Sequence, residues 1–265
     1  MQQIVNFYLQ SSLHVSLSVA AFTLLTFLQL ELPVDPFVLG YTFCASVVAY
    51  NFIKYAPVWI KDDLYQPTLI KVITVVFLIS LMVSMFFVPF KVIQLSNSLA
   101  FLIYAYTFPI SKHIKKLRQI PLLKLFTIGF IWSIVSTLFP LFSVDTSIPL
   151  SDIIFIVIER IVWVIALLLP FEVRDIAEDT KSGKSLIKLI GIARAKLIIT
   201  GLLVLFISLS YLVNEQLRAI DLFIYVSLII SVLLTQMKQH PYYSSLLVES
   251  LPVLWVLFWT VVTYV

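Results

Sequence analysis

The stretch IVWVIALLLPFEVRDIAEDTKSG, residues 161–183, joins a membrane-like apolar run to a densely charged segment. If the helix continues past Pro170, then Glu172, Asp175 and Asp179 lie on one helix face at the spacing i, i+3, i+7. Carboxylates grouped in this way attract a cation, and oxygen ligands suit Mg²⁺. The alternative is a solvated loop of mixed charge. The segment is therefore either a metal site at a helix end or an ordinary loop.

The composition indicates a membrane protein. The 265 residues are 61% hydrophobic and 12% charged, whereas soluble domains carry about 45–50% apolar and about 25% charged residues. We therefore predict an all-α, polytopic membrane protein, since helices satisfy their own backbone in lipid. The single cysteine, Cys44, excludes an internal disulfide and a cysteine-based zinc site. The net charge of +4 suits anionic lipids or an anionic substrate, and we expect no nucleic-acid partner.

Nine apolar runs are long enough to cross a bilayer, which needs about 20 residues per helix. Together they form a single predicted transmembrane domain, residues 1–265. The predicted spans lie near 11–31, 36–57, 68–90, 95–111, 121–142, 148–171, 194–213, 219–236 and 244–265.

Basic residues give the predicted orientation. Most Lys and Arg residues fall after the second, fourth, sixth and eighth spans, within 54–71, 112–124, 174–196 and at Lys238. The positive-inside rule places these connections in the cytoplasm. We therefore expect a cytoplasmic N-terminus and an outside C-terminus in a multi-pass membrane protein, with the bacterial inner membrane as its location.

An acid in the last span is a second candidate site. Glu249 lies in or near the apolar run that follows Tyr243, with Pro252 close behind. An ionisable group at membrane depth must face a cavity or a partner. We expect Glu249 either to orient an acceptor hydroxyl or amine, or to be a polar cavity residue or ion-pair member. Arg160 is one possible partner.

Three segments resemble the UbiA superfamily of intramembrane prenyltransferases. The segment EVRDIAEDTKSG, 172–183, is similar to the family's second Asp-rich motif, D-x-x-D-x-x-x-D. LIYAYTFPISKHIKKL, 102–117, resembles the Tyr-Pro-Lys element between helices 4 and 5, and YNFIKY, 50–55, falls where the first Asp-rich motif belongs. The matching residues of the second motif are Glu172, Arg174, Asp175, Asp179, Lys181 and Gly183.

The resemblance implies a fold and an activity. It implies a nine-helix bundle around a central cavity, and transfer of a prenyl group from a polyprenyl diphosphate to a membrane-soluble, often aromatic, acceptor. Asp175 and Asp179 would hold Mg²⁺, with Glu172 supporting them. The residues that would contact the substrates are Asn51, Lys54, Tyr106, Lys112, Arg174, Lys181 and Glu249.

The first motif departs from the family pattern N-x-x-x-D-x-x-x-D. Asn51 is present, but Tyr55 and Trp59 stand where the two acids belong. Asp62 and Asp63 come three or four residues later. Lys54 is close enough in sequence to replace a metal by contacting phosphate as a point charge.

Three function classes compete. The first is a UbiA-like prenyltransferase with an altered diphosphate site. The second is a non-catalytic UbiA-like protein that binds an isoprenoid or lipid, or serves as a membrane scaffold; Tyr55 and Trp59 favour it. The third is a solute transporter, which predicts Gly/Pro-broken helices in matching halves. Five glycines and no visible inverted repeat argue against the transporter.

Overall fold

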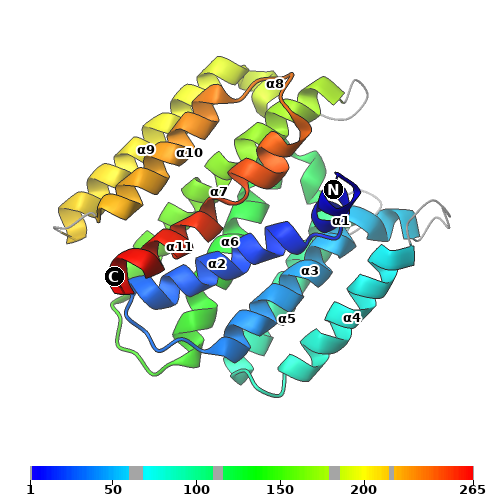
Figure 1. Ribbon diagram of the computed structural model, residues 1–265, viewed down its shortest axis with the longest axis vertical. Coiled ribbons are helices and arrows are strands. Elements are labelled where there is room, and N and C mark those ends of the chain that lie inside the picture. Colours follow the sequence, from blue (N-terminus) through cyan, green and yellow to red (C-terminus); the bar gives the residue numbers. More distant parts are fainter. Residues whose placement is uncertain (1, 60–67, 110–115, 179–185, 215–217, 265) are drawn as a thin grey trace. The chain divides into compact units, whose positions relative to one another are not determined.

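The computed structural model describes residues 2–59, 68–109, 116–178, 186–214 and 218–264, and these residues form helices and no strand (Figure 1). The chain divides into two compact units, each described separately below. Unit 1 is Met1–Leu117 with Ile134–Ile148, and unit 2 is Arg118–Ser133 with Pro149–Val265. The boundary passes through helix α6, Pro121–Ser143. The single domain 1–265 stays a prediction.

Five helical segments in the described part of the chain are long and apolar enough to cross a membrane, or six if the bent pair α1 and α2 counts as one. The five segments are Pro36–Val58, Pro121–Ser143, Leu150–Ile176, Ile192–Tyr211 and Tyr243–Val262. Helices α4, Thr68–Ser84, and α10, Ala219–Leu234, are apolar but shorter. Each of the nine predicted spans overlaps a helix. The multi-pass membrane class is confirmed, and the count of nine spans stays a prediction.

In unit 1, α3 (Pro36–Trp59) packs against α2 (Leu13–Gln29), α4 and α5 (Phe90–Thr107). Large apolar residues form the core of this unit because their runs recur on facing helix sides. The core residues are Phe27, Val38, Tyr41, Val88, Val92 and Phe139. The opposite side of α4 exposes Val72, Val75 and Ile79, which suits contact with lipid tails.

A bend lies at the start of the first predicted span, 11–31. Helix α1, Gln2–Gln10, meets α2 at an angle of 59°. Ser12, between them, has a φ of 63°, which is uncommon for a residue with a side chain and ends the regular helix. The hydroxyl of Ser11 donates to the carbonyl of Tyr8 at 3.1 Å, so it satisfies one orphan carbonyl of the α1 C-terminus.

In unit 2, α7 (Leu150–Glu178) packs against α9 (Ile192–Asn214), α10 and the short helix η2 (Tyr243–Val248). Helix α10 also contacts α9, beside which it runs in Figure 1, and α11 (Leu251–Tyr264). The short helices η1, Leu117–Gln119, and α8, Leu186–Ile190, join the longer elements.

Helices α6 and α7 approach closely at a glycine. A Cβ atom added to Gly129 would lie 3.2 Å from the carbonyl oxygen of Ile161. One turn further along α6, the Ser133 hydroxyl donates to the carbonyl of Val157 at 2.6 Å. Small residues at such positions let membrane helices pack closely. The candidate site lies beyond this approach, where Lys124 in the first turn of α6 meets Glu172 near the end of α7.

Candidate functional site

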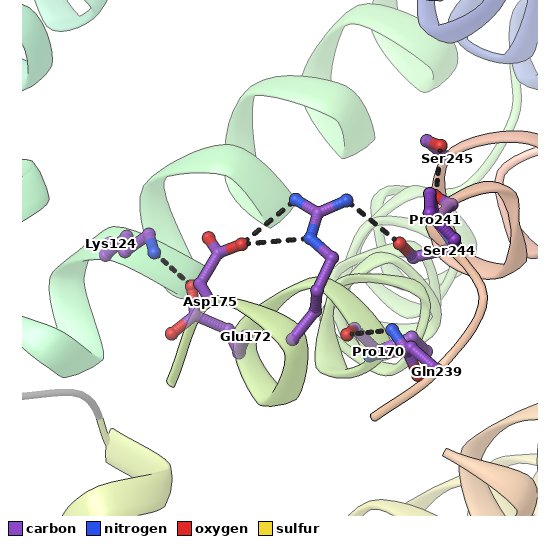
Figure 2. Close-up of polar contacts among 9 residues, drawn as sticks. Lys124, Pro170, Glu172, Asp175, Gln239, Pro241, Ser244 and Ser245 are labelled. Atoms are coloured by element: carbon purple, nitrogen blue, oxygen red, sulfur yellow. Dashed lines mark hydrogen bonds and ion pairs between the residues drawn. The ribbon is translucent and has the colours of Figure 1, made fainter. Parts of the chain in front are cut away.

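The charged end of α7 is helical as predicted. The helix contains Pro170 and continues to Glu178, so Glu172 and Asp175 lie three residues apart on one face. The amide of Gln239 donates to the carbonyl of Pro170 at 2.8 Å (Figure 2). Because Pro170 has no N–H, the carbonyl four residues earlier loses its helical partner. The bond from Gln239 is made to a different carbonyl, that of Pro170 itself, and ties the end of α7 to the segment before η2. Asp179 and Lys181 lie outside the described residues.

Glu172 is buried in an ion pair with Lys124. Its carboxylate Oε1 meets Nζ of Lys124 from the first turn of α6 (Figure 2). The side chain of Glu172 is 6% exposed and that of Lys124 is 30% exposed. A buried carboxylate needs a partner, because desolvation of an isolated charge is costly. From the sequence, Lys124 was predicted only as one of the basic residues of a cytoplasmic connection, and its contact with Glu172 was not expected.

Asp175 forms the second ion pair. Its Oδ1 accepts from Nε and Nη2 of Arg174 at 3.2 and 2.9 Å. The third guanidinium nitrogen, Nη1, donates to the hydroxyl of Ser244 at 3.2 Å. The guanidinium also lies over the ring of Phe171, 5.3 Å from its centroid. Asp175 is 45% exposed, so this pair is accessible from outside the helix bundle.

The last predicted span begins as a π-helix. Residues Tyr243–Val248 form η2, and the amide of Glu249 donates to the carbonyl of Ser244, five residues earlier, at 3.2 Å. Single π turns are frequent at functional sites. Ser244 is fully buried at the start of this turn and points toward the α7 end (Figure 2). Glu249 follows η2 and is half-buried; its proposed contact with an acceptor stays a prediction.

The two carboxylates, of Glu172 and Asp175, are the type of ligand that a divalent cation prefers. Glu172 and Asp175 supply hard oxygen donors from one helix face, and Mg²⁺ typically takes one or two carboxylates beside waters and phosphates. Both contacts from Arg174 fall on Oδ1 of Asp175, so its second oxygen lies outside that pair. Among the described residues no group of three acidic, His or Cys side chains is placed to hold a metal. The third acid of the motif, Asp179, is not described.

In unit 1, the side-chain amide of Asn51 is buried, and only its nitrogen has a hydrogen-bond partner among the described residues. Its Nδ2 donates to the hydroxyl of Thr74 at 2.9 Å, and that hydroxyl donates to the carbonyl of Ile70 at 2.7 Å. Because the Thr74 proton is already used, the amide must be the donor, which fixes the orientation of Asn51. Its Oδ1 is buried with no hydrogen-bond partner among the described residues. A buried polar atom of this kind calls for an explanation, and a ligand is one.

The residues that follow Asn51 bind backbone of α1. The Tyr55 hydroxyl donates to the carbonyl of Gln10 at 2.8 Å, and the Lys54 ammonium donates to the carbonyl of Leu9 at 3.3 Å. Tyr55, which stands where the UbiA pattern has an acid, and its neighbour Lys54 therefore hydrogen-bond to the end of α1. Contact between Lys54 and phosphate stays a prediction.

The other predicted site residues are less informative. Tyr106 is buried in the last turn of α5. Lys112, Asp62 and Asp63 lie outside the described residues, and of Trp59 only its place at the end of α3 is described.

A polar cluster that was not predicted from the sequence surrounds the buried Arg160, in the N-terminal half of α7. Arg160 is 2% exposed and lies close enough to Glu159, Tyr225 and Asp221 to interact electrostatically. Glu159 accepts hydrogen bonds from Tyr225 at 2.5 Å and Ser210 at 3.1 Å. The Trp255 indole donates to Asp221 at 2.7 Å. The adjacent Glu159 and Arg160 both had a signal in the sequence, as charges inside an apolar run, but only Arg160 was singled out as a possible partner.

These features define the described part of the chain as a helical, multi-pass membrane protein. No protein-family model matches the sequence, and no curated protein matches it. The solved structure of a UbiA homolog from Archaeoglobus fulgidus bound to GPP and Mg²⁺ is similar, with a TM-score of 0.52. The match covers 97% of this chain and 96% of that chain at 13% sequence identity. The resemblance seen in the sequence is confirmed for the fold.

Proposed function

We propose that this protein is a UbiA-like intramembrane prenyltransferase that moves a prenyl group from a polyprenyl diphosphate to a membrane-soluble acceptor. The observation that carries the proposal is the cluster at the end of α7, where Glu172 and Asp175 lie beside Lys124 and Arg174. A chain with a UbiA-like fold that places acids and bases together in this way has the groups that a metal and a diphosphate require.

The proposed chemistry separates charge in a water-poor site. The allylic C–O bond breaks and its electron pair leaves with the diphosphate; the carbocation is captured by the acceptor, which then loses a proton. Lys124 and Arg174 stabilise the leaving anion electrostatically, together with Lys112 and Lys181. Asp175 and Asp179 would hold Mg²⁺, which supplies further positive charge to the leaving oxygens.

The remaining residues position the reactants. Glu172 fixes the ammonium of Lys124 through their ion pair. By the resemblance, Asn51, whose Oδ1 is unsatisfied, and the buried Tyr106 would contact the substrate, and Glu249 would orient the acceptor. The proposal places the protein in a bacterial inner membrane with a cytoplasmic N-terminus, so the charged end of α7 faces the cytoplasm, as the basic connections indicate.

The test is binding of GPP to purified protein, with release of inorganic diphosphate as a second readout in the presence of a membrane lipid extract as the acceptor source. We expect Mg²⁺-dependent GPP binding in the wild type, weakened at least about tenfold in Asp175→Asn and Asp179→Asn. Asp152→Asn is the matched control, because Asp152 is an exposed acid at the other end of the same helix. Wild-type protein that binds no GPP with or without Mg²⁺ would refute the proposal.

A second candidate is a non-catalytic isoprenoid- or lipid-binding protein or scaffold. It is favoured by Tyr55, which binds the Gln10 carbonyl at a position where the UbiA pattern has a metal-binding acid. This candidate predicts that no diphosphate is released with any acceptor, and that Asp175→Asn leaves isoprenoid binding unchanged. The two readouts above therefore separate the candidates.

A further inference from the structure

The cluster at the end of α7 carries its own counter-ions. Two carboxylates and two cations form two ion pairs, Glu172 with Lys124 and Asp175 with Arg174. These four side chains together carry no net charge. A divalent cation that approaches either carboxylate meets a protein cation already in contact with it.

This arrangement opposes the binding of metal alone. The ammonium of Lys124 contacts a carboxylate that is only 6% exposed, so water screens their interaction poorly. A divalent cation on Glu172 would either displace this ammonium or lie beside it, and like charges at short distance repel. Arg174 has the same effect on Asp175, more weakly, because Asp175 is 45% exposed.

The cations have room to change partners. Arg174 already divides its donors between Asp175 and the neutral hydroxyl of Ser244, so Nη1 is held by a weaker partner than Nη2. Lys124 is 30% exposed and has a flexible four-carbon stem. A phosphate group at this place offers both cations a more highly charged acceptor than a carboxylate.

We propose that Lys124 and Arg174 compete with a divalent cation for Glu172 and Asp175, and that a diphosphate group relieves this competition by binding the two cations. Metal and diphosphate therefore bind this site together, and each binds poorly alone. The inference rests on the proposed function, because it takes the diphosphate ligand from it.

The test uses the intact protein in detergent and two separate titrations. Mn²⁺ binding is measured by electron paramagnetic resonance without any phosphate compound, and GPP binding is measured with EDTA present. We expect Arg174→Gln and Lys124→Gln to bind Mn²⁺ about tenfold more tightly than the wild type, within the usual range of coupling between sites. The same variants should bind GPP in EDTA about tenfold more weakly. Arg118→Gln, which removes an exposed charge from the same unit, should change neither.

The opposite direction of the two changes excludes a merely structural explanation, because a misfolded variant loses affinity for both ligands. If Lys124→Gln fails to fold, Arg174→Gln still provides the test. The ion pair between Arg174 and Asp175 is the more exposed of the two, so its loss disturbs the fold less. Unchanged or weaker Mn²⁺ binding by folded Arg174→Gln overturns the inference, even if the wild type binds GPP with Mg²⁺. If no variant or condition gives GPP binding while the Mn²⁺ difference persists, the proposed function fails and only the competition stands.

Discussion

Replacing Arg160 with methionine tests how much the buried cluster of α7 contributes to the fold. Arg160 is 2% exposed inside a segment apolar enough to cross a membrane, and its neighbours include Glu159 and Asp221. Arg160→Met keeps a similar apolar volume but removes the cation. It leaves two carboxylates close together in a medium that solvates them poorly.

Two magnitudes compete in this variant. Loss of the buried cation beside the half-buried Glu159 and Asp221 costs at most about 3–5 kcal/mol, the range for removing one partner of a buried ion pair. A hydrogen bond between membrane helices contributes about 0.6 kcal/mol on average. Glu159 keeps two hydroxyl donors, Tyr225 at 2.5 Å and Ser210 at 3.1 Å. These donors partly solvate its charge, so we expect the lower end of the first range, about 3 kcal/mol.

Unfolding by SDS in mixed micelles, followed by tryptophan fluorescence, measures this loss. Trp163 and Trp255 report on the same unit, since their ring centroids are 5.6 Å apart. The double variant Glu159→Gln/Arg160→Met should recover about 1–2 kcal/mol of the loss, because it removes one uncompensated charge. A loss below about 1 kcal/mol for Arg160→Met would show that the cluster is no more than a set of ordinary hydrogen bonds, and the electrostatic reasoning would be refuted.

Two further predictions concern packing and the first bend. Gly129→Leu should destabilise the protein by about 1–3 kcal/mol in the same unfolding assay, because its Cβ meets the Ile161 carbonyl at 3.2 Å; Gly201→Leu, where nothing lies within 4 Å, is the control, and equal losses would contradict the prediction. Tyr55→Phe should speed amide hydrogen exchange in Gln2–Gln10 about threefold, the loss of one membrane hydrogen bond. Tyr211→Phe, at an exposed position, should leave that exchange unchanged, and equal rates in Tyr55→Phe and wild type would argue against the contact.

The long helices were predictable from the sequence, because apolar runs of about 20 residues have the length of a helix that crosses a membrane. The predicted span 36–57 corresponds to α3, Pro36–Trp59, and 194–213 corresponds to α9, Ile192–Asn214. The bend at Ser12 was not predictable, since serine gives no strong signal for a positive φ.

The candidate site was predictable only for residues that lie close together in the sequence. Glu172, Arg174 and Asp175 share one segment, so their spacing on a helix could be read directly. Lys124 reaches Glu172 from another helix, and that contact depends on how the two helices pack. Ser244 resembles any small polar residue in an apolar run, and its contact with Arg174 depends on the fold.

The π turn at Tyr243–Val248 has a consequence for the register of the C-terminal helix. A turn closed by bonds between residues five apart holds one residue more than a regular turn. Every residue of α11 is therefore rotated by about 100° from the face that an unbroken helix would give it. The extra residue acts as an insertion absorbed within the helix, and it directs Trp255 toward Asp221. An alignment with a relative that lacks this turn needs a one-residue gap here, and an ungapped alignment would assign every later position to the wrong side of the helix.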